Sequence, residues 1–200
     1  MLLPLGLNLG CGPIMLKTID DVEFINIDND KLYYSYADKE GAKFDCFDLN
    51  NGLPKEIITE PVVFINMSQF LEHINLPAVD RLLFDCFIVM ESGAKIRISV
   101  PDTELLLFHL KTNKMQKFQE QQPKIWYNKY QSQMMKFALI LFGSLHENGD
   151  SGHKMCYDFI SMKELLEKAG FTRVKRVEFD KRYDAEVGEN HQLCVEAIRP

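Results

Sequence analysis

The chain has 200 residues and a formal net charge of −6, which argues against a protein that binds long polyanions over its whole surface. Its hydrophobic content of 46% is sufficient for one domain with a sizeable core. No stretch reaches the roughly 20 apolar residues that a membrane-spanning helix needs, and we expect no signal peptide. The five cysteines are scattered without a C-x-x-C pair, which is typical of reduced thiols, so we expect a cytoplasmic protein.

Short apolar runs alternate with helical patterns along most of the chain, which is typical of a parallel sheet covered by helices. The runs predict five parallel strands, at Leu5–Leu9, Glu23–Asp28, Lys43–Phe47, Val62–Met67 and Ala94–Val100. Apolar residues at helical spacing predict one helix from about Pro77 to Gly93 and another over Thr103–Lys111.

Two further strands are predicted near the C-terminus, at Thr172–Phe179 and Gln192–Ile198. The polar loop between them is too short for a crossover helix, so they are expected to be antiparallel. The helix before them is predicted to begin at a capping box of Ser161 and Glu164 and to end at Gly170. The expected fold is therefore α/β: a Rossmann-like, mostly parallel seven-stranded sheet with a C-terminal antiparallel hairpin and helices on both faces.

The segment from about 112 to 150 does not follow this alternation, and we interpret it as a helical insertion or lid after the fifth strand of a single domain, residues 1–200. Lysines outnumber acidic residues in and beside its first part, with aromatic residues interleaved: Lys111, Lys114, Lys117, Lys124, Lys129 and Lys136, with Trp126, Tyr127 and Tyr130. This pattern indicates either a solvated lysine face or a lid that binds an anionic or aromatic small molecule. The apolar run Met134–Phe142 would anchor the lid or form a homodimer interface.

The stretch LNLGCGP, residues 7–13, ends the first strand in a glycine turn. Glycines permit positive φ and let a ligand lie against bare backbone, beyond the carboxyl ends of the strands. Asp28 ends the next strand at about the separation at which a carboxylate accepts hydrogen bonds from ribose hydroxyls. Met15 replaces the third glycine of dinucleotide loops and Pro13 removes a backbone donor, which favours a nucleoside without phosphates.

An ordered set of motifs runs along nearly the whole chain, except for about 112–145: LNLGCGP, INIDND, FDLNNGLP, SQFLEHI, GAKIRISVPD and GHKMCYDFISMKELLEKAGF. Together they resemble the class I S-adenosylmethionine (SAM)-dependent methyltransferases, and look closest to a small bacterial-type branch with a shortened first helix. The resemblance implies SAM as the cofactor and methyl transfer as the reaction. An NAD(P)-dependent Rossmann oxidoreductase and a non-catalytic SAM-binding module are the alternatives.

The resemblance also implies which residues contact the cofactor: Asn8, Gly10, Cys11, Gly12, Asp28, Asp48, Leu49, Ser68 and His73. The glycine turn would lie against the methionine part of SAM, Asp28 would bind the ribose hydroxyls, and Asp48 would accept from the adenine amino group. The backbone N–H of Leu49 would donate to the adenine ring. Asn8 replaces an acid often found in this motif, so a negative charge near the sulfonium is missing.

The stretch LHENGDSGHKMCYD contains the candidate catalytic residues. Methyl transfer from a sulfonium requires mainly alignment in a dry pocket, and a general base only where the nucleophile must lose a proton. We expect His146 or His153 to act as this base or to orient the substrate; the alternative is that both are ordinary solvent-facing loop histidines. With Glu147 and Asp150, their spacing matches no firm metal template, so no metal is expected.

The expected acceptor is a small molecule, which could be anionic. A nucleic acid is disfavoured because the fourth strand ends in NMSQ, which lacks the Asn/Asp-Pro-Pro-aromatic motif of exocyclic-amine methylases. The chain also contains no Pro-Cys pair for attack on a pyrimidine ring, and its overall acidity opposes binding to long polyanions.

Overall fold

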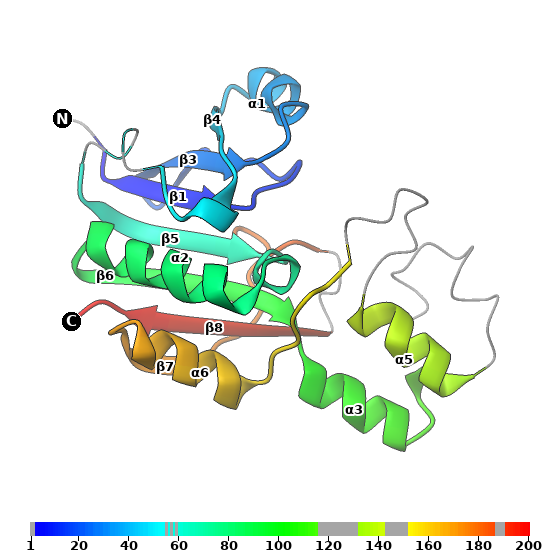
Figure 1. Cartoon of the computed structure of the whole chain (residues 1–200). Coiled ribbons are helices and arrows are strands. Elements are labelled where there is room, and N and C mark those ends of the chain that lie inside the picture. Colours follow the sequence, from blue (N-terminus) through cyan, green and yellow to red (C-terminus); the bar gives the residue numbers. More distant parts are fainter. Residues whose placement is uncertain are drawn as a thin grey trace.

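A computed structural model describes residues 3–54, 56, 58, 60–115, 132–142, 152–186 and 191–200 of the chain. The strands of this described part form one mixed sheet (Figure 1). They are β1 (Leu5–Leu9), β2 (Thr18–Ile19), β3 (Val22–Asp28), β4 (Lys43–Cys46), β5 (Val62–Ser68), β6 (Met90–Pro101), β7 (Thr172–Arg176) and β8 (Gln192–Ile198).

The strand order is β2-β3-β1-β5-β6-β8-β7, and β4 pairs with β3. Strand β1 is parallel to β3 and β5, and β6 is parallel to β5, whereas β8 is antiparallel to both β6 and β7. This confirms the predicted mostly parallel sheet with its C-terminal antiparallel hairpin. The two-residue β2, antiparallel to β3, was not predicted and adds an eighth strand.

The described helices are α1 (Tyr33–Glu40), α2 (Leu76–Val89), α3 (Thr103–Lys111), α5 (Gln133–Leu141) and α6 (Phe159–Lys168), with short 3₁₀ turns η1 (Leu49–Asn51) and η3 (Leu71–His73). Helices α2 and α6 lie side by side on one face of the sheet (Figure 1). Their apolar residues pack against alternate residues of the central strands, such as Leu7, Ile65 and Ile98, to form the main core.

Helix α1 lies on the opposite face of the sheet, at the β4 edge. Phe44 of β4 is level with Asn26 of β3 and so faces away from α2, because Asn26 alternates with the core residue Ile27. The rings of Tyr33 and Tyr34 in α1 contact Phe44 with centroid distances of 6.4 and 4.8 Å. Helices therefore cover both faces, as predicted. Between β1 and β3 the chain forms β2 in place of a helix, in agreement with the expected shortening.

A chain of buried amides crosses the face opposite α2. Asn66 donates to Asn8 (Nδ2–Oδ1 3.0 Å), and Asn8 donates in turn to Asn26 (Nδ2–Oδ1 2.8 Å). Asn8 also donates to the carbonyl of Ile14 (3.0 Å), and Asn26 both accepts from and donates to the backbone of Leu16 (2.8 Å each). These bonds hold the segment after the glycine turn against the sheet, where its polar backbone groups would otherwise lack partners.

Arg97 of β6 continues this row, since it is level with Asn66 of β5. Its buried guanidinium binds the Asp184 carboxylate in a bidentate manner, with Nε 3.0 Å from Oδ1, and its Nη1 lies 3.1 Å from Oε1 of Glu196. Its Nη2 also donates to the carbonyl of Glu178 (2.7 Å). These contacts fasten the segment after β7 across the face of the sheet that α2 leaves uncovered.

The part of the predicted insertion that the structure describes packs against α3. Leu106, Met115 and Leu141 form a small separate core between α3 and α5, which confirms a helix within the apolar run Met134–Phe142. Residues 116–131 and 143–151 lie outside the described residues, and with them three of the six lysines and all three aromatic residues assigned to the lid. Lys136 is buried, so the prediction that it belongs to an exposed lysine face is wrong. None of the described helices is long and apolar enough to cross a bilayer.

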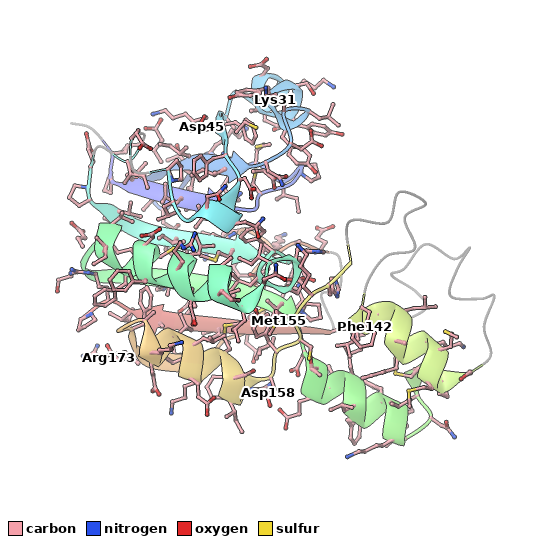
Figure 2. All side chains as sticks on the ribbon, in the orientation of Figure 1. Lys31, Asp45, Phe142, Met155, Asp158 and Arg173 are labelled. Carbon is pink, nitrogen blue, oxygen red and sulfur yellow. The ribbon has the colours of Figure 1, made fainter. Side chains whose placement is uncertain are left out.

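The start of α6 differs from the predicted capping box. The N-cap is Asp158, which lies at the start of the helix (Figure 2). Its Oδ1 accepts the N–H of Ser161 at 2.8 Å, and the Ser161 hydroxyl accepts the N–H of Asp158 at 3.0 Å. Ser161 is therefore the third helical residue and not the cap, and the predicted partner Glu164 lies in the middle of the helix. The prediction failed because Phe159 and Ile160 already adopt helical geometry.

Replacing Asp158 with alanine is expected to lower the free energy of unfolding by about 1 kcal/mol, since it removes the acceptor for an otherwise unpaired helical N–H. Denaturant unfolding followed by circular dichroism would measure this change. Glu164→Ala, at an exposed position on the same helix, should change the free energy by less than about 0.5 kcal/mol. Equal effects of the two substitutions would contradict the assignment of the cap.

Candidate functional site

The glycine turn is tied to the end of the neighbouring strand. Gly10 and Cys11 both donate their N–H groups to the carbonyl of Ile27 (2.8 and 3.3 Å). Gly12 donates its N–H to Oδ2 of Asp28 (2.9 Å). The predicted turn and the predicted ribose-binding carboxylate therefore lie side by side at the carboxyl edge of the sheet, where open α/β sheets bind ligands.

Asp48 follows the strand next to that of Asp28. Asp28 pairs with Cys46 of β4, and the N–H of Phe47 donates to the carbonyl of Asp28 (2.9 Å). The Asp48 carboxylate begins η1 by accepting from the N–H and side-chain amide of Asn50 (3.0 and 2.8 Å). The two carboxylates thus end adjacent strands at one edge, as the sequence predicts.

Both carboxylates keep lone pairs for a ligand. Asp28 accepts from Gly12 on one oxygen and, at 2.8 Å, from Asn29 on the other, while the two bonds from Asn50 to Asp48 use a single oxygen. A carboxylate has about four acceptor positions. Asp28 is half-buried and Asp48 exposed, so both carboxylates are accessible, and their acceptor chemistry is suited to hydroxyl and amino groups such as those of an adenosine.

The two glycines of the turn differ in what surrounds them. Both have positive φ, +64° for Gly10 and +53° for Gly12. A Cβ on Gly10 would come within 2.1 Å of the Phe70 ring, whereas the nearest atom to a Cβ on Gly12 is the Tyr33 hydroxyl at 4.0 Å. Gly10 is thus needed for packing, and Gly12 presents an open side on which a ligand could rest.

The remaining predicted cofactor residues have mainly supporting contacts. Asn8 is buried beneath the turn, with its amide engaged in the sheet. Burial, and then the charge of Asp28, raises the pKa of the Cys11 thiol, which disfavours a reactive thiolate there. Ser68 ends β5, with its hydroxyl 2.8 Å from that of Ser99 and accepting an N–H at 2.8 Å. Leu49 is buried at the start of η1. Contacts of these four residues with a cofactor remain predictions.

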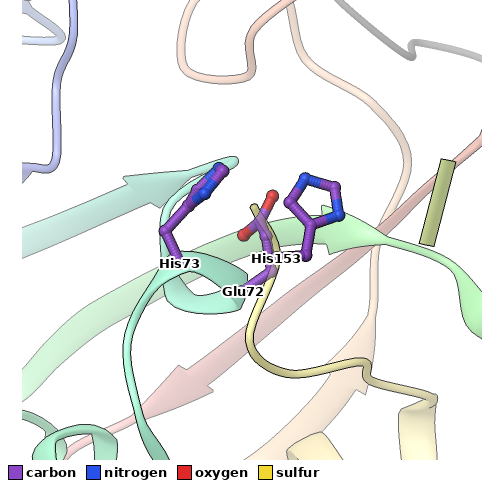
Figure 3. A group of neighbouring side chains, drawn as sticks. All are labelled: Glu72, His73 and His153. Atoms are coloured by element: carbon purple, nitrogen blue, oxygen red, sulfur yellow. The ribbon is translucent and has the colours of Figure 1, made fainter. Parts of the chain in front are cut away.

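A second group of side chains lies where β5 turns into η3 (Figure 3). It consists of Glu72 and His73, both in η3, and His153, which lies on the segment leading to α6; one ligand atom from each falls within 4.8 Å of the others. The carbonyl of Glu72 accepts the N–H groups of Lys154 and Met155 (2.6 and 3.1 Å), and these bonds bring His153 beside η3. His73 and His153 meet edge to face, with ring centroids 4.8 Å apart. His146 lies outside the described residues.

Glu72 is a buried acidic residue. It is 1% exposed, and neither of its carboxylate oxygens has a hydrogen-bond partner among the residues the structure describes. Burial raises the pKa of Glu72 to about 8, and burial also lowers the pKa of His153, opposed by its hydrogen bonding to the carbonyls of Leu141 and Ile140. The motif SQFLEHI contained Glu72, but no spacing rule marked it as functional, since its partner His153 is 81 positions further along the chain.

Comparisons with known proteins identify the fold. No family model matches the chain, and no curated protein matches its sequence. Among solved structures, it is similar to a SAM-dependent methyltransferase from Archaeoglobus fulgidus, with 15% identity and a TM-score of 0.59 over 98% of this chain and 86% of that one. The SAM-dependent methyltransferase SibL has 12% identity and a TM-score of 0.59, over 99% of this chain and 51% of that one.

Human N-acetylserotonin methyltransferase in complex with SAM is also similar, with 13% identity, a TM-score of 0.54, and coverage of 99% of this chain and 48% of that one. The chain therefore spans about half the length of SibL and of the human enzyme. It has the fold of the class I SAM-dependent methyltransferases, which confirms the resemblance predicted from the sequence. At these identities the likeness establishes the fold and not the reaction.

Proposed function

We propose that this protein is an enzyme that transfers the methyl group of SAM to a small-molecule acceptor. The observation that carries the proposal is the hydrogen bond from Gly12 to Asp28, with Asp48 on the adjacent strand, in a sheet of methyltransferase topology. A bare backbone beside two carboxylates is suited to the sulfur, ribose and adenine parts of one ligand.

Asp28 and Asp48 would hold the ribose and the adenine, and the open side of Gly12 would accommodate the methionine part. Bound SAM supplies an electrophilic methyl group on a good leaving group. The protein then has to align the acceptor with that methyl and to exclude water. Glu72 and His73, which follow β5, and His153, which lies beside them on the segment before α6, are the described polar side chains best placed to orient an acceptor there.

The lysine-rich segment bears on the class of acceptor. The lysines of the segment 111–136 favour an anionic small molecule, although Lys136 is buried and so contributes no exposed charge.

The scattered thiols favour a location in the reducing cytoplasm. The chain could also form a homodimer through α5, in which the exposed side chains of Met134 and Phe142 would pack against the partner subunit.

The first test is calorimetric titration of the purified chain with SAM and with S-adenosylhomocysteine. Asp28→Asn keeps the shape but removes the charge, and it is expected to weaken binding about 10- to 100-fold, equivalent to about 1.5–3 kcal/mol for hydrogen bonds to a charged group. Asp38→Asn, an exposed acid in α1, is the matched control and should leave affinity unchanged.

Two results would contradict the proposal. Tighter binding of NADPH or NADH than of SAM would favour the oxidoreductase alternative. SAM binding that survives Asp28→Asn would place the cofactor elsewhere. If SAM binds but no methylated product forms with any anionic or neutral small-molecule pool, the non-catalytic SAM-binding module becomes the better description.

A further inference from the structure

The group formed by Glu72, His73 and His153 has the donors of a transition-metal site. Two imidazole nitrogens and one carboxylate oxygen form a set that binds Zn²⁺ in catalytic sites and Fe²⁺ in the 2-His-1-carboxylate arrangement. Magnesium and calcium prefer oxygen ligands, so they are a poorer match. The metal template considered from the sequence combined His153 with His146, Glu147 and Asp150, and not with Glu72 and His73.

The geometry is close to that of a bound ion. Bonds of about 2.1 Å allow two donors on one tetrahedral ion to lie about 3.4 Å apart. The three ligand atoms lie within 4.8 Å of one another, so each pair would have to close by up to about 1.4 Å. Figure 3 shows the Glu72 carboxylate between the two imidazole rings, so rotation of these side chains could achieve this.

The burial of Glu72 is the independent observation that points to a ligand. A carboxylate removed from water at a cost of several kcal/mol normally has hydrogen-bond donors or a cation beside it. Glu72 is 1% exposed, and its two oxygens have no hydrogen-bond partner in the described part of the chain. A divalent cation between Glu72 and the two histidines would compensate for this burial.

One ring nitrogen of His153 makes the kind of hydrogen bond that commonly orients a metal-binding histidine. Its Nδ1 lies 3.0 Å from the carbonyl oxygen of Leu141. A carbonyl only accepts, so Nδ1 carries the hydrogen and Nε2 keeps a lone pair for a ligand. A metal-bound histidine usually donates its other N–H to a carbonyl or carboxylate, which fixes both the ring and its tautomer.

We infer that Glu72, His73 and His153 bind one divalent transition-metal ion, with Zn²⁺ as the leading candidate, at the end of β5. Three protein ligands leave at least one coordination position open. If the proposed function holds, an acceptor oxygen would occupy that position and be oriented towards the methyl group. Metal binding itself does not depend on methyl transfer, so the two proposals can fail separately.

The test uses the full chain, untagged and stripped of metal with a chelator. Titration with Co²⁺ should give visible absorption bands with a stoichiometry of one ion per chain, and Zn²⁺ should displace the Co²⁺. Glu72→Gln and His153→Gln are each expected to weaken Zn²⁺ binding at least about 100-fold, since loss of even an outer partner costs 10- to 100-fold. The matched controls Glu164→Gln and His109→Gln should bind Zn²⁺ like the unaltered protein.

Thermal unfolding supplies a second readout. Zn²⁺ should raise the melting temperature of the unaltered chain and of both controls, but not that of Glu72→Gln. The inference is overturned if the stripped chain takes up neither Co²⁺ nor Zn²⁺, or if the Glu72 and His153 variants bind Zn²⁺ as tightly as the controls. If those variants do not fold, the Co²⁺ spectrum of the unaltered chain decides, because an ion without nitrogen ligands would contradict the site.

Discussion

Replacing Arg97 with methionine is expected to lower the free energy of unfolding by about 3–5 kcal/mol, the cost of removing one partner from a buried ion pair. Arg97 is 3% exposed, and its guanidinium is the cation that binds the buried Asp184 carboxylate. Without it, Asp184 would remain in a low-dielectric environment without its cation, and the segment after β7 would lose its attachment to the sheet. Denaturant unfolding measures the change.

Arg176→Met is the matched control for this prediction. Arg176 also binds two carboxylates, those of Asp102 and Glu104, but its side chain is about half exposed. Water can partly replace a half-exposed guanidinium, and the buried Asp102 keeps the N–H of Leu105 as a donor, so the control should be destabilised less than Arg97→Met. Adding Asp184→Asn to Arg97→Met should recover part of the loss because it removes the uncompensated charge. An Arg97→Met variant no less stable than Arg176→Met would refute the argument.

Gly10→Ala is expected to cost about 2–5 kcal/mol and to weaken SAM binding with it. A left-handed backbone costs a non-glycine residue about 1–2 kcal/mol. The new Cβ would also lie 2.1 Å from the Phe70 ring, and such overpacking typically costs a further 1–3 kcal/mol or so. Thermal and denaturant unfolding would measure the stability, and calorimetry the binding.

Gly12→Ala separates the backbone cost of an alanine in the turn from the steric cost of its contact with Phe70. Gly12 has nearly the same backbone conformation, but a Cβ there meets nothing closer than 4.0 Å. It should therefore show only the backbone cost of about 1–2 kcal/mol. Phe70→Leu combined with Gly10→Ala should recover part of the steric cost. Equal destabilisation by the two alanine substitutions would show that Phe70 imposes no constraint on the turn.

The elements with a strong local signal could be predicted from the sequence. The β1 run, the helix α3 and the β8 run were placed with their observed bounds, because short apolar runs and helical spacing mark buried segments. The antiparallel terminal hairpin followed from the length of one loop. Asp28 and Asp48 were correctly placed at one sheet edge, since the carboxyl ends of parallel strands share an edge.

Other elements left no such signal. Helix α1 buries only Ala37 and lies at the edge of the sheet, so it has no apolar stripe that periodicity could detect. The two residues of β2 are too few to establish alternation. The group of Glu72 and His153 is brought together by backbone hydrogen bonds between η3 and a segment about 80 positions away, and a single sequence contains no trace of that contact.

The buried amides of Asn26, Asn8 and Asn66 have a further consequence for how the chain folds. All three lie at one level of three adjacent parallel strands, so their hydrogen bonds form in only one alignment. A slip of one residue in β1 would turn Asn8 towards the aliphatic core and leave the other two amides buried without it. The three asparagines therefore penalise misaligned sheets that hydrophobic packing alone would tolerate.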